Sequence, residues 1–263
     1  MTWLTRRVAL WAAAAGVGVL MSACQSGGGP GTSSPPGTST SSAARPSSTS
    51  APELPGGCSD SAPCRFDAGT YSLSMNSVLP GMTLTLPAGW SSIEHTAAEL
   101  KLVPPGQPDH WLFIWIDMAA VKSTGPGHGT TVLTKVKPTP EGLIGWLTTN
   151  PDFTILEKPA ATTIAGTPMR TLSLVVSRSA RYGDPGCPDN PRCADLFTRP
   201  GLWGTNFYSI GGEEEAKLSL GTIRTKGASH TLIVNLDAPN HAELAKLSAV
   251  ARPILESIQL PTS

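Results

Sequence analysis

The sequence has little charge and no excess of either sign. Of its 263 residues, 14% are Asp, Glu, Lys or Arg, and 19 basic residues balance 19 acidic ones. Proteins that bind nucleic acid need a basic surplus to neutralise phosphates, and electrostatic attachment to anionic lipid needs a cluster of Lys and Arg. Neither occurs in this sequence, so we predict no nucleic-acid partner and no attachment to a membrane by charge alone.

Sequence motifs for catalysis and for metal binding are also missing. The sequence has no G-x-S-x-G motif, no Ser-x-x-Lys joined by its usual partner motifs, and no two His residues at i, i+4 spacing. The cysteines lack the Cys-x-x-Cys spacing of zinc sites. We therefore assign no catalytic, metal-binding or cofactor-binding residue. Whether the protein is an enzyme stays open, with the balance against it, because an acid–base pair distant in sequence leaves no motif.

The apolar run near the start is too short to span a membrane. Val8–Met21 is uncharged over 14 residues, whereas a spanning helix needs about 20. The run follows Arg6 and Arg7 and precedes small residues, which is the order of parts in a secretory signal peptide. We predict that residues 1–23 are such a signal. The paired arginines leave general secretion and twin-arginine export as alternatives.

The end of this signal carries a cysteine. Leu20-Met21-Ser22-Ala23-Cys24 resembles the lipobox of bacterial lipoproteins, with Met21 where that family usually has Leu. The resemblance implies cleavage before Cys24, a diacylglyceryl group on its thiol, and further acylation such as palmitate. Two acyl chains suffice for stable anchoring. We therefore expect a lipid anchor in the cell membrane and a protein on its extracytoplasmic face. The alternative is an ordinary secretory signal with a coincidental cysteine.

A low-complexity segment follows the predicted anchor. Of the 33 residues 25–57, all but four are Gly, Ser, Thr, Pro or Ala. Such a segment buries too little apolar surface to offset its chain entropy. We predict a disordered tether over residues 24–57, long enough to hold a domain away from the membrane. Its Ser/Thr/Pro composition also resembles O-glycosylated stalks, and glycosylation is left open.

Four cysteines remain once Cys24 is assigned to lipid. Cys58 and Cys64 form one pair with five residues between them, and Cys187 and Cys193 form another. An even number of cysteines in an exported protein indicates disulfides. Three connectivities are possible, and we favour the two local pairs because each brackets a turn that contains proline.

Residues 58–263 are predicted to form one α+β domain with a mainly antiparallel sheet flanked by helices. A helix should begin at Thr139-Pro140 and stop at Asn150-Pro151, and a final helix should begin at Asn240. Trp111–Ile116 is apolar on both alternating faces, so we expect that strand to be buried on both sides. Tyr71–Val78 and Met82–Leu86 are expected to be strands joined by a turn at Pro80-Gly81. The other expected strands are Leu100–Val103, Phe153–Glu157, Ala161–Ile164, Met169–Ser177, Phe207–Ile210, Lys217–Thr225 and His230–Leu236.

Several short motifs in this domain resemble known proteins. They are Gly69-Thr70-Tyr71 leading to Leu86-Pro87-Ala88-Gly89-Trp90, the helix stop followed by Thr162–Pro168, Cys193–Phe197, and Leu255–Ile258. Together they resemble a family of uncharacterised actinobacterial secreted and membrane-attached proteins. The first motif and the final helix are also similar to PsbP-like α-β-α sandwiches, which implies a sheet covered by helices on both faces. Neither family supplies catalytic residues that map onto this chain.

Two regions are candidates for recognition. Ser179–Gly204 has no helix or strand periodicity, and long irregular loops in compact domains are often functional. We predict that this loop, with Trp203, Phe207 and Tyr208, forms a recognition surface. The aromatic face of Trp111–Trp115 is either a ligand platform or core packing. The three acidic residues 213–215 follow Gly211-Gly212 and are predicted to be a solvated hairpin tip.

Three functions remain open at this stage. The one we favour is a membrane-anchored envelope lipoprotein with a non-catalytic domain that binds an envelope protein, a glycan or a small apolar ligand. The second is a hydrolase or transferase acting on envelope polymers, and the third is an assembly factor for a membrane complex. A deep pocket would favour binding, two inward carboxylates would favour an enzyme, and a flat apolar patch would favour assembly.

Overall fold

A computed structural model describes residues 51–75, 79–96, 98–123, 130–180, 192–199, 207–225 and 227–261. The predicted signal peptide, Cys24 and tether residues 24–50 lie outside these residues, so their assignments stay predictions. The described residues all belong to one structural unit, which begins at Ser48.

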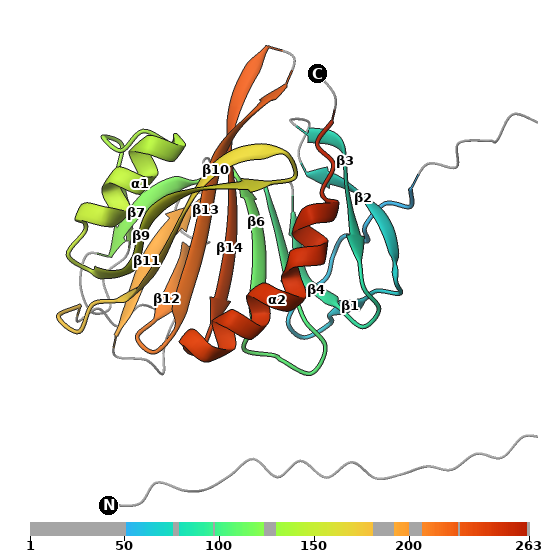
Figure 1. The fold of residues 1–263 in the computed structure, drawn as a ribbon, viewed down its shortest axis with the longest axis horizontal. Helices are drawn as coiled ribbons and strands as arrows, with labels where there is room; N and C mark the ends of the chain where they lie inside the picture. Colours follow the sequence, from blue (N-terminus) through green and yellow to red (C-terminus); the bar gives the residue numbers. More distant parts are fainter. Residues whose placement is uncertain are drawn as a thin grey trace, which may run out of the picture. The chain divides into compact units, whose positions relative to one another are not determined.

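The described part contains fourteen strands and two helices (Figure 1). In chain order they are β1 (Cys64–Arg65), β2 (Gly69–Met75), β3 (Leu79–Leu86), β4 (Ser91–Thr96), β5 (Glu99–Val103), β6 (Trp111–Ile116), β7 (Ala119–Ser123), β8 (Thr130–Val132), α1 (Pro140–Thr149), β9 (Phe153–Ile164), β10 (Thr167–Val176), β11 (Cys193–Thr198), β12 (Phe207–Gly211), β13 (Glu215–Thr225), β14 (Ala228–Ala238) and α2 (His241–Ser257).

Eight of the strands form one sheet in the order β1-β4-β5-β6-β14-β13-β10-β9, and every pairing in it is antiparallel. A second sheet has the order β12-β11-β7-β8, and β2 and β3 form a separate hairpin. The prediction of a mainly antiparallel α+β domain with a C-terminal helix is therefore confirmed at this level.

Both helices begin where the sequence predicts. Thr139 caps α1, its side chain accepting a hydrogen bond from the Gly142 amide, and Pro140 occupies the first turn. Asn240 caps α2 by accepting from the Glu243 amide at 3.1 Å. Each cap satisfies an amide that the helix itself leaves without a partner. Because these caps are local, they can be read from sequence alone.

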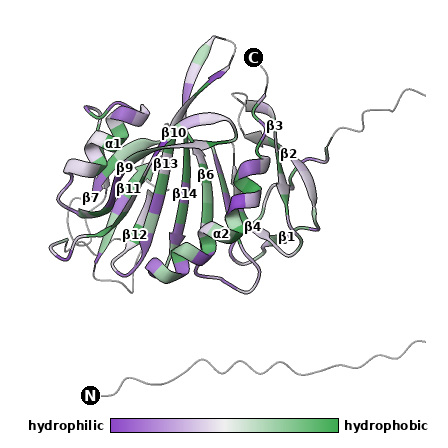
Figure 2. Cartoon of the chain, viewed as in Figure 1, coloured by the Kyte–Doolittle hydropathy of each residue, from purple (hydrophilic) through white to green (hydrophobic). Residues whose placement is uncertain are grey.

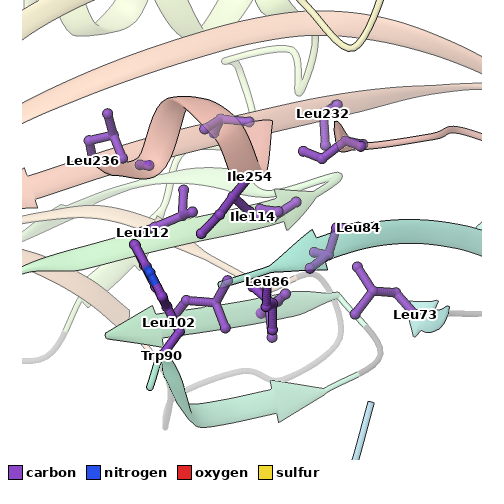
Figure 3. Packing of buried hydrophobic residues seen from close by; sticks show 14 of the residues in the cluster. Leu73, Leu84, Leu86, Trp90, Leu102, Leu112, Ile114, Leu232, Leu236 and Ile254 are labelled. Carbon is purple, nitrogen blue, oxygen red and sulfur yellow. The ribbon is translucent and has the colours of Figure 1, made fainter. Parts of the chain in front are cut away.

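The two helices cover opposite faces of the large sheet. Helix α2 runs across one face over β14 and beside the β2–β3 hairpin (Figure 1). In Figure 3, Ile254 of α2 lies with Leu112 and Ile114 of β6, and hairpin residues close the same core. Helix α1 packs on the other face, in a second core that includes residues of β7, β11 and β12.

Strand β6 lies between the two cores. Leu112, Ile114 and Ile116 contribute to the core under α2, whereas Phe113 and Trp115 contribute to the core under α1. Figure 2 shows the hydrophobic residues concentrated along β6 and β14. The prediction that this strand is buried on both faces is confirmed, and it places the two aromatic side chains in the second core.

The folded domain begins earlier than Cys58. Leu54 is only 2% exposed and belongs to the core under α2, and its amide donates to the carbonyl of Ser72 at 2.9 Å. Its neighbour Glu53 forms a parallel bridge with Ser72. The end of the range predicted as tether is therefore part of the fold, because its one leucine reaches an apolar core.

Two local predictions were wrong. Pro80 and Gly81 lie inside β3 instead of in a turn, where the β2–β3 register is irregular. Such a bulge tolerates proline and glycine, which are also turn residues. Residues 193–198, predicted as irregular loop, form strand β11, in which all six residues are buried. A strand buried on both faces shows no polar–apolar alternation, so periodicity does not detect it.

Candidate functional site

The structure describes only part of the recognition residues predicted from sequence. Tyr208 lies in β12 and packs against the second core. Phe207 begins the same strand, but its side chain lies outside the described part, as does all of Trp203. Most of the predicted recognition loop, namely residues 181–191 and 200–204, is also outside the described residues.

One predicted disulfide is present and the second is partly described. Cys58 and Cys64 are bonded to each other. Cys193 is also disulfide-bonded, but Cys187 lies outside the described residues, so its pairing stays a prediction.

The acidic tip behaves as predicted only in part, because Glu213 is exposed whereas Glu215 is 2% exposed and 3.1 Å from His241 Nδ1.

Tyr208 borders a cavity of about 210 Å³ on the face of the large sheet that carries the second core. Strands β4, β5, β6 and β14 supply its floor, and β11 and β12 supply the opposite wall. The lining residues are Glu94, Lys101, Phe113, Trp115, Leu196, Tyr208, Ser209, Asn235 and Asp237.

Three aromatic rings that line this cavity contact one another. The ring centroid of Trp115 is 4.7 Å from that of Phe113 and 4.8 Å from that of Tyr208. The rings of Phe113 and Tyr208 meet edge to face at 6.3 Å. The sequence left core packing and a ligand platform as alternatives for the β6 aromatic face. Phe113 and Trp115 belong to the core and also line a cavity, so the two alternatives do not exclude each other.

Strand register places polar side chains on the same face. In β14, Asn235 lies opposite Phe113 and Asp237 lies opposite Trp111, and Lys101 of β5 lies opposite Phe113 from the other side. Directly opposed antiparallel residues point to the same face. Asn235 and Asp237 are only 1% and 4% exposed. These two side chains are the polar residues that sequence reasoning missed.

A signal for these residues exists in the sequence. In Leu232–Ala238, Asn235 and Asp237 alternate within a strand that is otherwise apolar. Polar residues at period two in a buried strand indicate one face that is not fully apolar. A sequence interpretation that attends only to apolar periodicity passes over them.

Three polar atoms beside the cavity have no partner. They are the hydroxyl of Tyr208, Oδ1 of Asn235 and Oδ1 of Asp237, each buried and without a hydrogen bond in the described part of the chain. Leaving a buried polar atom without a hydrogen bond costs about 1–3 kcal/mol. Three such atoms at one place indicate a site whose hydrogen bonds are completed by something else.

Burial also changes the acidity of the site. It raises the pKa of Asp237 well above its ordinary value, the negative charge of Glu214 acts in the same direction, and Lys101 opposes both. Burial therefore favours the neutral form of Asp237 over the charged one. The ammonium of Lys101 lies 5.1 Å from the ring centroid of Trp111 and 5.3 Å from that of Phe113. These cation–π contacts keep the lysine against the aromatic wall.

A larger groove of about 350 Å³ lies between α2 and strands β9, β10, β13 and β14. Three of its polar residues are bonded: Lys217 pairs with Glu157 at 3.1 Å, and Ser219 donates to Thr171 at 3.0 Å. The buried polar atoms without a partner in the described part include none from this groove, so it gives less indication of a ligand than the smaller cavity does. We therefore take the smaller cavity as the candidate site.

The described residues hold no cluster of three or more His, Cys, Asp or Glu side chains that could bind a metal ion. Within the same residues, neither helix has the length and hydropathy required to cross a membrane.

Comparison with known proteins gives no family. No protein-family profile and no curated protein matches the chain. Among solved structures, LpqN, described as involved in cell envelope biogenesis of Mycobacterium tuberculosis, is similar with a TM-score of 0.37 and 16% identity over 75% of this chain and 87% of that one. A protein from Bacteroides thetaiotaomicron has a TM-score of 0.30 and 9% identity over 69% of this chain and 46% of that one. At these TM-scores neither likeness assigns a fold or a function.

Proposed function

We propose that this protein is a lipid-anchored lipoprotein of the cell envelope whose domain binds a small ligand in the cavity beside Tyr208. The predicted signal peptide of residues 1–23, the lipobox-like Cys24 and the low-complexity tether support the location. The cavity supports the activity. The observation that carries it is the group of three buried polar atoms without hydrogen bonds beside an aromatic wall.

The groups that line the cavity indicate what kind of ligand it would bind. Ligand sites are concave and apolar with a few fixed polar groups that orient the ligand. Here Trp115 and Phe113 provide the apolar surface, and Asn235 and Asp237 provide the polar groups. A purely apolar ligand would leave the polar atoms without partners, so a ligand with its own hydrogen-bonding groups fits better.

The fold we propose is an α-β-α sandwich of the PsbP-like kind. Helix α1 packs on one face of the large sheet through Leu143 and Leu147, and α2 packs on the other through Leu247 and Ile254. This arrangement supports the proposed fold. It holds β6 and β14 rigid between two cores, which is what a preorganised binding site needs.

Native mass spectrometry tests the binding. The full-length protein would be purified from bacterial membranes in mild detergent and sprayed under non-denaturing conditions. We expect a bound small molecule on the wild type and on Ser248→Ala, a change in the other groove. We expect its loss from Asn235→Leu, in which an apolar side chain replaces a cavity amide. An unliganded wild type, or a ligand retained by Asn235→Leu, would contradict the proposal.

The anchor is tested separately. Intact mass of the membrane-extracted protein should correspond to residues 24–263 plus acyl chains. Cys24→Ser should move the protein from the membrane fraction to the soluble fraction without changing the fold of the domain. A wild type that is found unacylated would refute the anchor but leave the cavity proposal intact.

A second candidate function is hydrolysis of an envelope polymer. Two carboxyl groups, those of Glu94 and Asp237, line the cavity, and burial raises the pKa of Asp237. A proton-donating acid and a carboxylate across a sugar are the groups that glycoside hydrolysis uses. Release of p-nitrophenol from p-nitrophenyl glycosides by the wild type, lost in both Glu94→Gln and Asp237→Asn, would establish this function. Absence of release would leave binding without catalysis.

A further inference from the structure

We propose that the ligand of this cavity is a neutral sugar, held as a single ring against Tyr208 and hydrogen-bonded by Asn235, Asp237 and Lys101. This inference rests on the proposed function, because it names the class of ligand for the same site. It follows from the shape of the cavity, its hydrogen-bonding groups and its charge.

Tyr208 offers the cavity an apolar surface for one face of a sugar ring. Its side chain is half-buried, and it packs against Trp115, which is only 1% exposed and whose ring centroid is 4.8 Å away. The ring carbons and hydrogens of a sugar present an apolar face, with the hydroxyls at its edge. Packing that face against Tyr208 removes apolar surface from water on both partners.

The polar groups beside the wall are a mixture of donors and acceptors. The ammonium of Lys101 donates only, whereas the amide of Asn235 both donates and accepts. A protonated Asp237 carboxyl also does both, and the Tyr208 hydroxyl can do either. A sugar hydroxyl donates and accepts at the same oxygen, so it can satisfy every member of this set.

Ligands that carry only donors or only acceptors would not satisfy every member of this set. An ammonium has donors only and would leave the donors of Lys101 without acceptors. A carboxylate or phosphate has acceptors only and would leave Oδ1 of Asn235 without a donor.

The charge of the lining also favours a neutral ligand. Glu94 and Lys101 lie opposite each other in adjacent strands, and their formal charges cancel. Burial raises the pKa of Asp237, which disfavours a further negative charge in the lining. A charged ligand would therefore lose its hydration without gaining an opposite charge, which is costly. A neutral hydroxylated ligand loses less hydration and regains hydrogen bonds.

The volume limits the size of the ligand. Pockets for drug-sized molecules span about 300–1,000 Å³, whereas this cavity holds about 210 Å³. One sugar ring fits that space, and a disaccharide would have to extend beyond it. The inference is therefore limited to one ring, either a free monosaccharide or a terminal unit of a longer glycan.

Titration with defined probes tests whether the ligand is a neutral sugar. The full-length protein in detergent would be titrated with D-glucose, D-galactose, D-mannose and L-arabinose, and in parallel with tetramethylammonium chloride and sodium benzoate. Saturation-transfer NMR and Trp fluorescence would report binding. We expect at least one sugar to bind saturably, with no saturable binding of the two ions. We expect affinity to fall at least tenfold in Asn235→Leu and severalfold in Tyr208→Phe, with Ser248→Ala unchanged.

The variants distinguish a failure of the sugar inference from a failure of the proposed function. Tyr208→Phe keeps the ring and the packing, so it remains informative if Asn235→Leu fails to fold. Sugar binding that neither variant weakens would place the sugar elsewhere and overturn the inference. Cavity-dependent binding of tetramethylammonium or benzoate in place of sugar would overturn the sugar class and leave the proposed function standing. No probe binding, together with no ligand in native mass spectrometry, would overturn both.

Discussion

The indole Nε1 of Trp115 donates a hydrogen bond to Oε1 of Glu99 at 3.0 Å, and both side chains are buried. The other carboxyl oxygen of Glu99 is buried without a partner in the described residues. Burial, and after it the charge of Glu94, raises the pKa of Glu99 to about 8. The aromatic residue at the centre of the cavity wall is therefore fixed from behind by an acid that is protonated at neutral pH.

This acid should make the stability of the domain depend on pH. Glu99 titrates near 4.5 when unfolded and near 8 when folded. Between these values the folded state holds a proton that the unfolded state has lost, so the free energy of unfolding falls as pH rises. The full loss is on the order of 3–5 kcal/mol by pH 8. Urea unfolding at a series of pH values between 4.5 and 8.5 measures it.

Glu99→Gln removes this titration. We expect the variant to lose much less stability over the same pH range, and to exceed the wild type most at pH 8. Glu53→Gln changes an exposed acid and should follow the wild type. Parallel pH profiles for the wild type and Glu99→Gln would show that Glu99 does not titrate as the structure indicates.

Tyr208→Phe should stabilise the unliganded protein. The Tyr208 hydroxyl is buried without a hydrogen bond, so its removal should raise the free energy of unfolding by about 1 kcal/mol. Tyr71→Phe is a matched control, because the Tyr71 hydroxyl donates to the carbonyl of Asp67 at 3.0 Å. That change should be neutral or destabilising by up to about 1 kcal/mol. Equal destabilisation by both changes would mean that the Tyr208 hydroxyl has a partner.

Leu54→Ala should destabilise the domain although the residue lies in a low-complexity segment. Leu54 is 2% exposed in the core under α2, whereas Leu156 on β9 is 50% exposed. Truncating a buried leucine costs about 2–5 kcal/mol, and truncating an exposed one usually changes stability by less than about 0.5 kcal/mol. Denaturant unfolding of Leu54→Ala and Leu156→Ala compares them. Similar small effects would place residue 54 in the tether.

Removing the Cys58–Cys64 disulfide should have a moderate effect. The bond joins residues six apart in sequence, and the chain-entropy relation gives about 2.4 kcal/mol for so short a loop. We expect the double change Cys58→Ser and Cys64→Ser to lower the free energy of unfolding by about that amount. A loss far below 1 kcal/mol would indicate that the hydrogen bonds between Pro52, Leu54 and Ser72 already hold this segment.

Features of the fold that depend only on residues close in sequence were predictable. The caps Thr139 and Asn240 and the stop at Asn150 are set by hydrogen bonds within one turn of helix. Strand β6 was predictable because six apolar residues in a row leave no solvated face. Strand β11 was missed because all six of its residues are buried, and its pairing with β7 joins segments distant in sequence.

The candidate site was predictable only in fragments. Tyr208 and the β6 aromatic residues were identified separately, and nothing in the sequence joined them. Asn235 and Asp237 were overlooked because each is an ordinary polar residue until the register of β14 against β6 places it beside Phe113 and Trp111. The predicted recognition residue Trp203 lies outside the described part and stays untested.

The sequence by itself determined the fold class and the positions of both helices, because local hydrogen bonds and apolar periodicity are properties of adjacent residues. It favoured the Cys58–Cys64 pair among three connectivities, and the structure contains that bond. It also carries the evidence for an anchor at Cys24. Only the tertiary structure decided that Leu54 belongs to the core and that aromatic, amide and carboxyl groups from separate strands surround one cavity. Strand order and register bring such groups together, and these depend on the packing of the whole sheet between its two cores.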